Sequence, residues 1–281
     1  MATIVYGNGT AAQLPSSLLS EIFGNGADGA VDLDGTNTYA WASKSGAAYT
    51  LLRDVYATTL IVQNGSLLKT NGFRVFASTS LNVVSGGAVE NDAEGTYTGA
   101  VRGYLGGGAN GGFGGGGGNS LSFSAGGNGG AGGAGSSLPG SSGGTAQYSK
   151  AQFAALEGYV GALLAITTHM AGGAGGGGGG IDGINPATSG GGGGGVVIIA
   201  APTITGSGTI RANGQVGQSA SGGTNNGGAG GGGGGCVVLV TSTAVSGPTI
   251  QANAGSGGSG AGTGINGSAG SSGSTRNIVL S

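Results

Sequence analysis

Two stretches of the sequence share one unusual pattern, and they decide which kind of fold the chain can adopt. Residues 190–200 read Gly-Gly-Gly-Gly-Gly-Gly-Val-Val-Ile-Ile-Ala, and residues 230–240 read Gly-Gly-Gly-Gly-Gly-Gly-Cys-Val-Val-Leu-Val. The apolar run that ends each stretch is typical of a buried β-strand. The match continues to Thr209-Ile210, which falls on Thr249-Ile250 forty residues later. A unit of about 40 residues, containing a strand and a polyglycine run, therefore repeats.

The same unit recurs on both sides of these two copies. Forty residues after Cys236, residues 276–281 (Arg-Asn-Ile-Val-Leu-Ser) begin a third copy. Upstream, residues 75–89 align with residues 196–210 at an offset of 121. The repeat therefore joins the two halves of the chain.

Glycine makes up 75 of the 281 residues, and ordering a glycine costs more backbone entropy than ordering any other residue. Such segments either remain flexible linkers or gain a packed role that offsets this cost. The packed state that suits them is an extended helix of three residues per turn, whose N–H and C=O groups all bond to neighbouring segments. We predict a polyglycine II bundle with rods at residues 106–108, 111–118, 126–135, 172–180, 190–195, 222–235 and 255–264. Its connectors would be residues 119–125, 136–148, 181–189 and 265–275.

Composition divides the chain after residue 102. Residues 1–102 carry most of the charge, and we interpret them as a β-rich part for assembly or anchoring. Strand-like runs occur at residues 49–52, 58–63, 72–77 and 80–84, separated by the turn-forming dipeptides Asn64-Gly65, Asn71-Gly72 and Gly86-Gly87. They predict an all-β stack, sandwich or β-helix. Residues 103–281 form the glycine-rich part, so the expected fold is mainly β with a polyglycine bundle.

One helix is expected inside the glycine-rich part, over residues 149–171. Ser149 and Gln152 have the spacing of a capping box. Apolar residues then recur in steps of three and four, as in a coiled-coil seam. They are Phe153, Leu156, Val160, Leu163 and Met170, with Thr167 at the intervening position before Met170. The seam indicates either a homo-oligomer, such as a trimer, or a helix packed on its own sheet.

Low charge excludes several classes of function. Charged residues are 6% of the chain and the net charge is -2, which argues against binding nucleic acid through its phosphates. The single Cys236 excludes a disulfide framework, and we expect neither a signal peptide nor a membrane span. One His and ten carboxylates offer little for catalysis, so we predict no enzyme, no cofactor and no metal site. Asp28, Asp32 and Asp34 resemble half of a calcium loop, for which turn chemistry is the simpler interpretation.

Aromatic residues in low-charge loops are the candidate contacts with a receptor. Rings beside Asn, Ser and Thr can stack on sugars, while neighbouring side chains bond sugar hydroxyls. The alternative is that each ring holds a loop against the rods. These residues are Tyr97, Tyr104, Phe113, Phe123 and Tyr148.

The residues of the first part resemble a known group. The segments 26–31 (Gly-Ala-Asp-Gly-Ala-Val), 52–56 (Leu-Arg-Asp-Val-Tyr) and 72–76 (Gly-Phe-Arg-Val-Phe) are similar to the opening of glycine-rich bacteriophage virion proteins. The polyglycine runs resemble the distal adhesins of T-even phage tail fibres, which pack polyglycine II helices and present variable loops. The first resemblance covers residues 24–95, and the second is compositional over residues 103–275.

This resemblance implies a non-enzymatic virion protein, assembled in the host cytoplasm, that displays loops from a tail fibre or tail tip. Its partners would be other virion proteins and a glycan or protein of the host surface. A capsid decoration or head-fibre protein is the first alternative. A secreted ice-binding or cell-wall glycine-rich protein is the second. A depolymerase would need paired carboxylates, for which Glu90, Asp92 and Glu94 are the one cluster.

Overall fold

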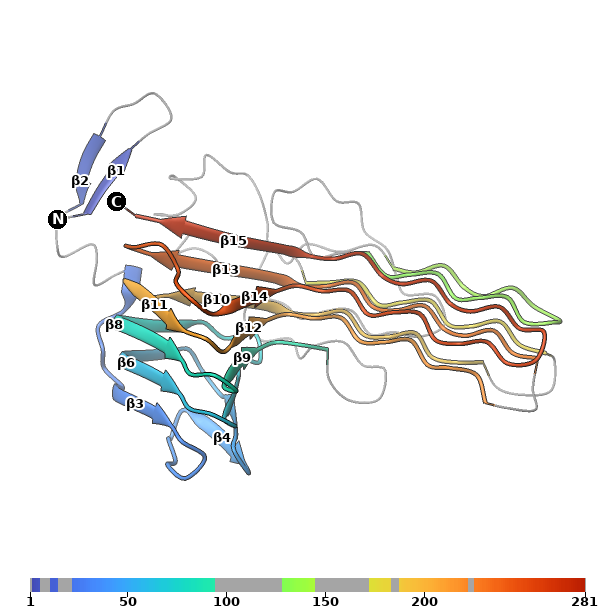
Figure 1. Ribbon diagram of the computed structural model, residues 1–281, viewed down its shortest axis with the longest axis horizontal. Helices are drawn as coiled ribbons and strands as arrows, with labels where there is room; N and C mark the ends of the chain where they lie inside the picture. The colour runs from blue at the N-terminus through green and yellow to red at the C-terminus, as the bar shows by residue number, and fades with distance from the viewer. Residues whose placement is uncertain are drawn as a thin grey trace.

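The computed structural model describes residues 2–5, 11–14, 22–93, 128–144, 172–182, 187–221 and 225–280. Over these residues the protein is mainly β, as predicted, with helical geometry only at Ile22 and Phe23. The helix expected at residues 149–171 lies outside the described residues. Two stacked sheets occupy one side of the molecule, and long extended segments run away from them on the other side (Figure 1).

The larger sheet has the order β15 (Ser274–Val279), β13 (Cys236–Thr241), β10 (Val196–Ala200), β8 (Val75–Val83), β6 (Val55–Val62) and β3 (Gly29–Leu33), with β11 (Thr203–Gly206) also paired with β8. The smaller sheet has the order β14 (Thr249–Gln251), β12 (Thr209–Arg211), β9 (Ala88–Glu90), β7 (Leu67–Lys69), β5 (Ala48–Leu51) and β4 (Ala42–Ser45). A separate hairpin pairs β1 (Ala2–Val5) with β2 (Ala11–Leu14).

From β6 onward the chain passes back and forth between the two sheets, so that each pass adds a strand to each sheet. Within the two sheets only β4 and β5 pair antiparallel. The predicted turn dipeptides reverse the chain between the sheets, with φ of 76° at Gly65, 52° at Asn71 and 79° at Gly86. Two strands expected at residues 72–77 and 80–84 are a single strand, β8. That expectation was wrong because β8 stays paired with β6 throughout, and a register shift between Ala57 and Thr59 absorbs the irregularity.

The sequence repeat corresponds to the register of the strands in the sheets. Val196 pairs with Cys236 and Thr209 with Thr249, so the 40-residue offset places equivalent residues side by side. The offset of 121 holds where Ala88 pairs with Thr209. It fails at β8, where Val75 pairs with Ile199 and not with Val196, which places Val75 on the face of the core between the sheets. The third copy was also misaligned, since Cys236 pairs with Ser274 and not with Arg276.

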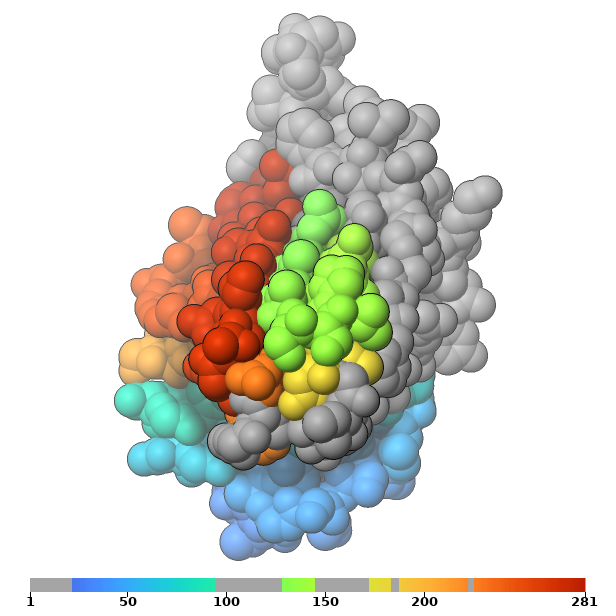
Figure 2. All heavy atoms as spheres, turned by 90° about the vertical axis from the view of Figure 1, so that its right-hand side faces the viewer, coloured from blue at the N-terminus to red at the C-terminus, as the bar shows by residue number. Residues whose placement is uncertain are grey.

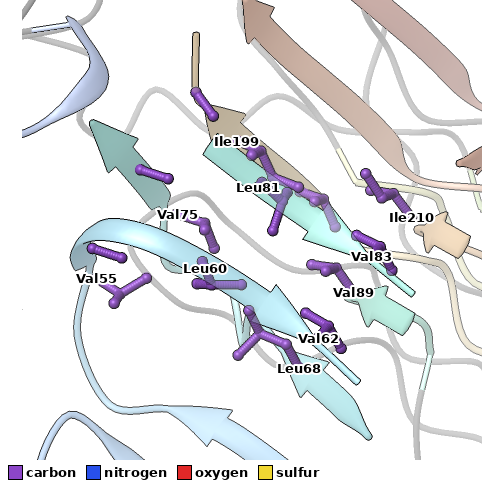
Figure 3. Close-up of a cluster of buried hydrophobic side chains, with 14 of the residues drawn as sticks. Val55, Leu60, Val62, Leu68, Val75, Leu81, Val83, Val89, Ile199 and Ile210 are labelled. Carbon is purple, nitrogen blue, oxygen red and sulfur yellow. The ribbon is translucent and has the colours of Figure 1, made fainter. Parts of the chain in front are cut away.

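The main core lies between the two sheets (Figure 3). Leu60, Leu81 and Ile199 from the larger sheet pack with Leu68 and Ile210 from the smaller one. A second buried cluster lies on the opposite face of the larger sheet, where Phe76, Val196 and Val238 gather. Strands β10 and β13 are therefore buried on both faces, which explains their unbroken apolar sequences. Cys236 belongs to this second cluster, as a small buried residue.

The glycine-rich segments run alongside one another, and we call them rods and the set of rods the bundle. The rods are residues 128–135, 138–144, 172–180, 187–195, 212–220, 225–235, 252–261 and 264–273. Rods 187–195, 225–235 and 264–273 lead directly into β10, β13 and β15, and rods 212–220 and 252–261 continue from β12 and β14. The sheets therefore set where these five rods begin.

Rod 225–235 is enclosed by the others. Successive N–H groups along this rod donate to three neighbouring rods in turn, so every third N–H bonds to the same rod. Gly230, for example, donates to Gly177 at 2.8 Å. The accepting rods are 172–180, 212–220 and 264–273. Its carbonyl groups accept bonds in the same rotation from rods 128–135, 187–195 and 252–261. Figure 2 views the bundle from the end of the rods that lies away from the sheets.

These six neighbours form a closed ring, because each also bonds to the next one around the central rod. Rod 138–144 lies outside the ring against rods 128–135 and 172–180. A Cβ placed on Gly228, Gly230 or Gly231 would come closer than 3 Å to backbone atoms of a neighbouring rod. The central rod therefore requires glycine for the close approach of backbones.

The bundle includes segments that were expected to be connectors. The described parts of the segments expected as rods all take part in the bonded network, whereas residues 106–108 and 111–118 lie outside the described residues. Parts of the expected connectors 136–148, 181–189 and 265–275 are rods too, as are residues 212–220. An outer rod needs glycine only where it faces another rod. In rod 264–273 these positions are Gly264, Gly267, Gly270 and Gly273, which all face the central rod.

Side chains on outer rods bond to N–H groups that have no further rod beside them. The side-chain oxygens of Asn213 and Ser219 accept bonds from the N–H groups of Asn253 and Ser259, at 2.8 and 3.0 Å. Midway between these pairs, Val216 lies opposite Ser256, whose N–H has no acceptor among the described residues. Val216 is 52% exposed, so the position between rods 212–220 and 252–261 is open to solvent here.

The enclosed rod gives the first prediction. Gly231→Ala should destabilise the protein by about 1–3 kcal/mol, because its Cβ overlaps the backbone of rod 252–261. Urea unfolding would measure this difference. The matched control is Ser256→Ala on the exposed side of rod 252–261, which should change stability by less than about 0.5 kcal/mol. Equal effects of the two changes would contradict the enclosed position of Gly231.

The exposed position at Val216 gives the second prediction. Val216→Asn should supply the missing acceptor to the Ser256 N–H, as Asn213 does for Asn253, and stabilise the protein by about 0.5–1.5 kcal/mol. Thermal unfolding would measure the gain. Val216→Ala, which offers no acceptor, is the control, and a gain of the same size in that variant would count against the hydrogen bond.

Candidate functional site

The strongest candidate site is the free end of the bundle, which is the end of the rods that lies away from the sheets (Figure 1). Residues 135–138, 181–182, 225–226 and 261–265 come together there. Each of these segments belongs to a turn, or to the start or end of a rod, so the positions of the rods decide which side chains meet.

Backbone hydrogen bonds hold this end together. Ser137 and Leu138 both donate to the carbonyl of Ile181, at 3.1 Å, and Ser136 donates to Asn225 at 3.0 Å. The turn after Ala261 closes on itself, because Gly264 donates to the Ala261 carbonyl at 2.8 Å. The Ala261 N–H also donates to Asn226 at 3.0 Å, so four separate pieces of the chain are linked through backbone groups.

A network around Asp182 adds side-chain bonds. The Asp182 N–H donates to the side-chain oxygen of Asn226 at 2.8 Å, and its carboxylate accepts the Asn225 N–H at 3.2 Å. Asn225 in turn accepts the Thr263 N–H at 3.1 Å, and the Ser137 hydroxyl donates to the Asp182 carbonyl at 2.8 Å. Among the described residues of the rods and of the turns that join one rod to another, Asp182 is the only Asp, Glu, Lys or Arg.

Two large apolar side chains are exposed beside this network. Leu138 is 53% exposed and Ile265 is 61% exposed. They flank the end of rod 128–135, because Gly135 bonds to Leu138 and Ile265 bonds to Ala134. Behind them, the sides of rods 252–261 and 264–273 expose small or polar residues in three-residue steps. These are Asn253, Ser256, Ser259, Asn266, Ser268, Ala269, Ser271 and Ser272.

This arrangement suits binding by shape and hydrogen bonding. Hydroxyl, amide and apolar groups are held by a hydrogen-bonded backbone, so little side-chain or loop entropy remains to be lost when a ligand binds. A single carboxylate among neutral groups offers little attraction to a highly charged ligand.

The receptor contacts predicted from the sequence lie outside the described residues. This holds for Tyr97, Tyr104, Phe113, Phe123 and Tyr148, and also for the seam residues Phe153, Leu156, Val160, Leu163 and Met170. The sequence reasoning missed Leu138, Asp182 and Ile265. The available signal was their position as bulky or charged residues in short breaks between glycine-rich segments.

The carboxylates considered for catalysis are part of an ion-pair network. Arg211 on β12 binds Glu90 and also Asp92, the latter at 2.7 Å. Asp92 also accepts the Asn213 N–H, and burial raises the pKa of the Glu90 carboxyl. Glu90 is 5% exposed. The pair therefore links β9 to β12 where the smaller sheet meets the rods, and Glu94 lies outside the described residues.

The three aspartates of the suspected calcium loop bind groups of the protein itself. Asp28 pairs with Arg53 at 2.6 Å, and this hydrogen bond lowers the pKa of Asp28. Asp32 accepts the Gln63 side-chain amide at 3.0 Å. Asp34 caps a turn by accepting the hydroxyl and N–H of Thr36 and the N–H of Asn37. Among the described residues no cluster of three possible metal-binding side chains is found.

Comparisons with known proteins add no relative: no family model, curated protein or solved structure matches this chain. Within the described ranges, no helix has the length and apolarity needed to cross a membrane.

The Asp34 turn gives a pH prediction. The hydrogen bond from the Thr36 hydroxyl, with the N–H bonds of Asn37 and Thr36, lowers the pKa of Asp34 to about 2 from 3.8. The stabilising effect of the ionised carboxylate is therefore present above pH 3.8 and is lost as the pH falls through about 2. NMR titration of the carboxyl carbon would measure this value. In Thr36→Ala, the value should move toward 3.8, and an unchanged value would contradict the assigned cause.

Proposed function

We propose that this chain is a non-enzymatic structural protein of a bacteriophage particle that displays the free end of its bundle toward a host surface. One observation supports this most strongly: the central rod is hydrogen-bonded on all sides, which makes the bundle a stiff arm. The placement in a phage rests on the sequence resemblance of residues 24–95. The expected trimer remains a prediction.

We assign the arm to the polyglycine II class. Support comes from the three-residue rotation of hydrogen bonds along rod 225–235, which matches a helix of three residues per turn. We assign the two sheets to a β-helix-like stack that anchors the arm. The alternation of parallel strands between the sheets supports this assignment.

A stiff, nearly uncharged arm fits a display role. Flexible linkers would let the tip lose its shape, whereas a bundle with few loops keeps its end groups in place. The weak charge limits nonspecific attraction, so binding would depend on the fit of Leu138, Ile265 and the Asp182 network to a partner. A glycan or a protein of the cell surface is the expected partner.

Binding to cells tests this proposal. The fluorescently labelled full chain should bind at least one member of a panel of bacterial strains, measured by flow cytometry. Leu138→Asp combined with Ile265→Asp should reduce binding at least tenfold, because both side chains lie at the free end. Val216→Asp, which changes an equally exposed apolar residue on the side of a rod, is the control and should bind normally.

The two placements in a particle give different outcomes. Binding to empty capsids without binding to cells would favour the capsid decoration or head-fibre alternative. Absence of binding to both would contradict a display role.

A second candidate function rests on the exposed rows of small side chains on rods 252–261 and 264–273. Uncharged rows repeated every three residues would suit a regular surface such as ice. Thermal hysteresis of the purified protein would favour that function, and its absence together with cell binding would favour display.

A further inference from the structure

The two sheets do not end at the same strand position along the stack. This offset leaves a place for one additional strand at the edge of the smaller sheet. Consecutive strands β6 and β7, β8 and β9, and β13 and β14 lie at matching positions in the two sheets. Among the described strands, only the larger sheet continues beyond β13 and β14, with β15. Beyond β6 and β7, the larger sheet has only β3, whereas the smaller sheet has β5 and β4. Figure 1 shows β15 at one end of the stack and β3 and β4 at the other.

At the end formed by β14 and β15, no described strand occupies the next position of the smaller sheet. Thr249 donates to Gly208 and Gln251 accepts from Ala212, so these residues bond toward β12 and the backbone of Ile250 faces the open edge. Opposite this position, β15 exposes Thr275, Asn277 and Val279, the last by 45%. The corresponding face of β13 is buried, with Val237 and Leu239 in the main core. A strand beside β14 would cover this face of β15.

The rods that continue from this end of the stack leave no room for a further rod. The side-chain oxygen of Asn266 accepts the N–H of Gly260 at 2.8 Å, in the groove where a further rod would lie. Asn266, Ala269 and Ser272 also expose their side chains there, which would keep another backbone at a distance. The open position is therefore confined to the sheets.

The opposite end of the stack presents the strand that is missing here. Within the part of the chain that the structure describes, β4 pairs with β5 alone, antiparallel, and extends one strand past the larger sheet. Leu52 donates to Trp41 at 2.9 Å, so the antiparallel alternation turns the backbone of Lys44 to the open edge. The Lys44 ammonium lies 5.8 Å from the Tyr49 ring of its own copy. It is thereby held over its own sheet.

We propose that copies of this chain stack head to tail, with β4 of one copy entering the open position beside β14 and beneath β15 of the next. The extra strand β4 of one copy then fills the empty position beside β14 of the next copy, and both sheets continue across the junction. The receiving residues on β14 and β15 that line the position are uncharged, so Lys44 meets no like charge. Pairing of two identical ends would instead leave two strand positions empty. This stacking is independent of the display function and can fail without affecting it.

Self-association of the full chain tests the proposal. Sedimentation velocity over a range of concentrations should show a ladder of species, because head-to-tail contacts do not close on themselves. Val279→Lys should abolish the concentration dependence. Ile265→Lys, at an exposed apolar residue on the free end, is the matched control and should associate like the unmodified chain. A monomer at every concentration, or equal loss in both variants, would overturn the proposal.

Cross-linking identifies the paired strands. A mixture of Ile250→Cys and Lys44→Cys chains should form disulfide-linked dimers on mild oxidation, whereas neither variant alone should. Cys236 should not compete, because burial raises the pKa of its thiol to about 12. Thermal unfolding would verify that both variants keep the fold. Dimers of Ile250→Cys alone would indicate pairing of identical ends and would overturn the proposal, as would no dimers in the mixture.

Discussion

Close approach of backbones without intervening side chains is the constraint on which the rest of this structure depends. Within the bundle, rod 225–235 donates hydrogen bonds to three rods and accepts them from three others. At Gly228, Gly230 and Gly231 an added Cβ would overlap backbone atoms of a neighbouring rod, so the close packing requires glycine at these positions. The hydrogen bonds offset the entropy lost in ordering so much glycine. Apolar packing is concentrated in the sheets, where the two clusters of large buried side chains lie.

The sheets and the bundle depend on each other through shared chain segments. Rods pass directly into β10, β13 and β15, so the register of these strands also sets the register of the rods. Asn91 bridges the junction: its N–H donates to Arg211, its carbonyl accepts from Gly195, and its side chain bonds to Val196 at 3.0 Å. Arg211 joins the same region to Glu90 and Asp92. A hydrophobic stack and a polar bundle are thereby held in one alignment.

Two surfaces follow from this alignment, and they differ in chemistry. The free end of the bundle carries apolar and hydrogen-bonding groups around one carboxylate, on which the proposed display function rests. The end of the β-stack offers an open backbone edge and a partly exposed strand, on which the proposed stacking of copies rests. The strands and the rods run roughly along one direction, while neighbouring strands add at right angles to it (Figure 1). Display and assembly would therefore use different directions of the molecule.

The sequence by itself determined the β character, the turn dipeptides and the 40-residue repeat, and β10 pairs with β13 at that offset because it places similar apolar patterns side by side. It did not determine the register of β15, since a shift of two residues leaves every side chain on the same face of the strand. Nor did it identify rod 264–273, whose glycines occur once in three because its other positions face outward. Only the tertiary structure decided which residues lie at the free end. Leu138, Asp182 and Ile265 are far apart in the chain, and they meet because the rods that carry them end together.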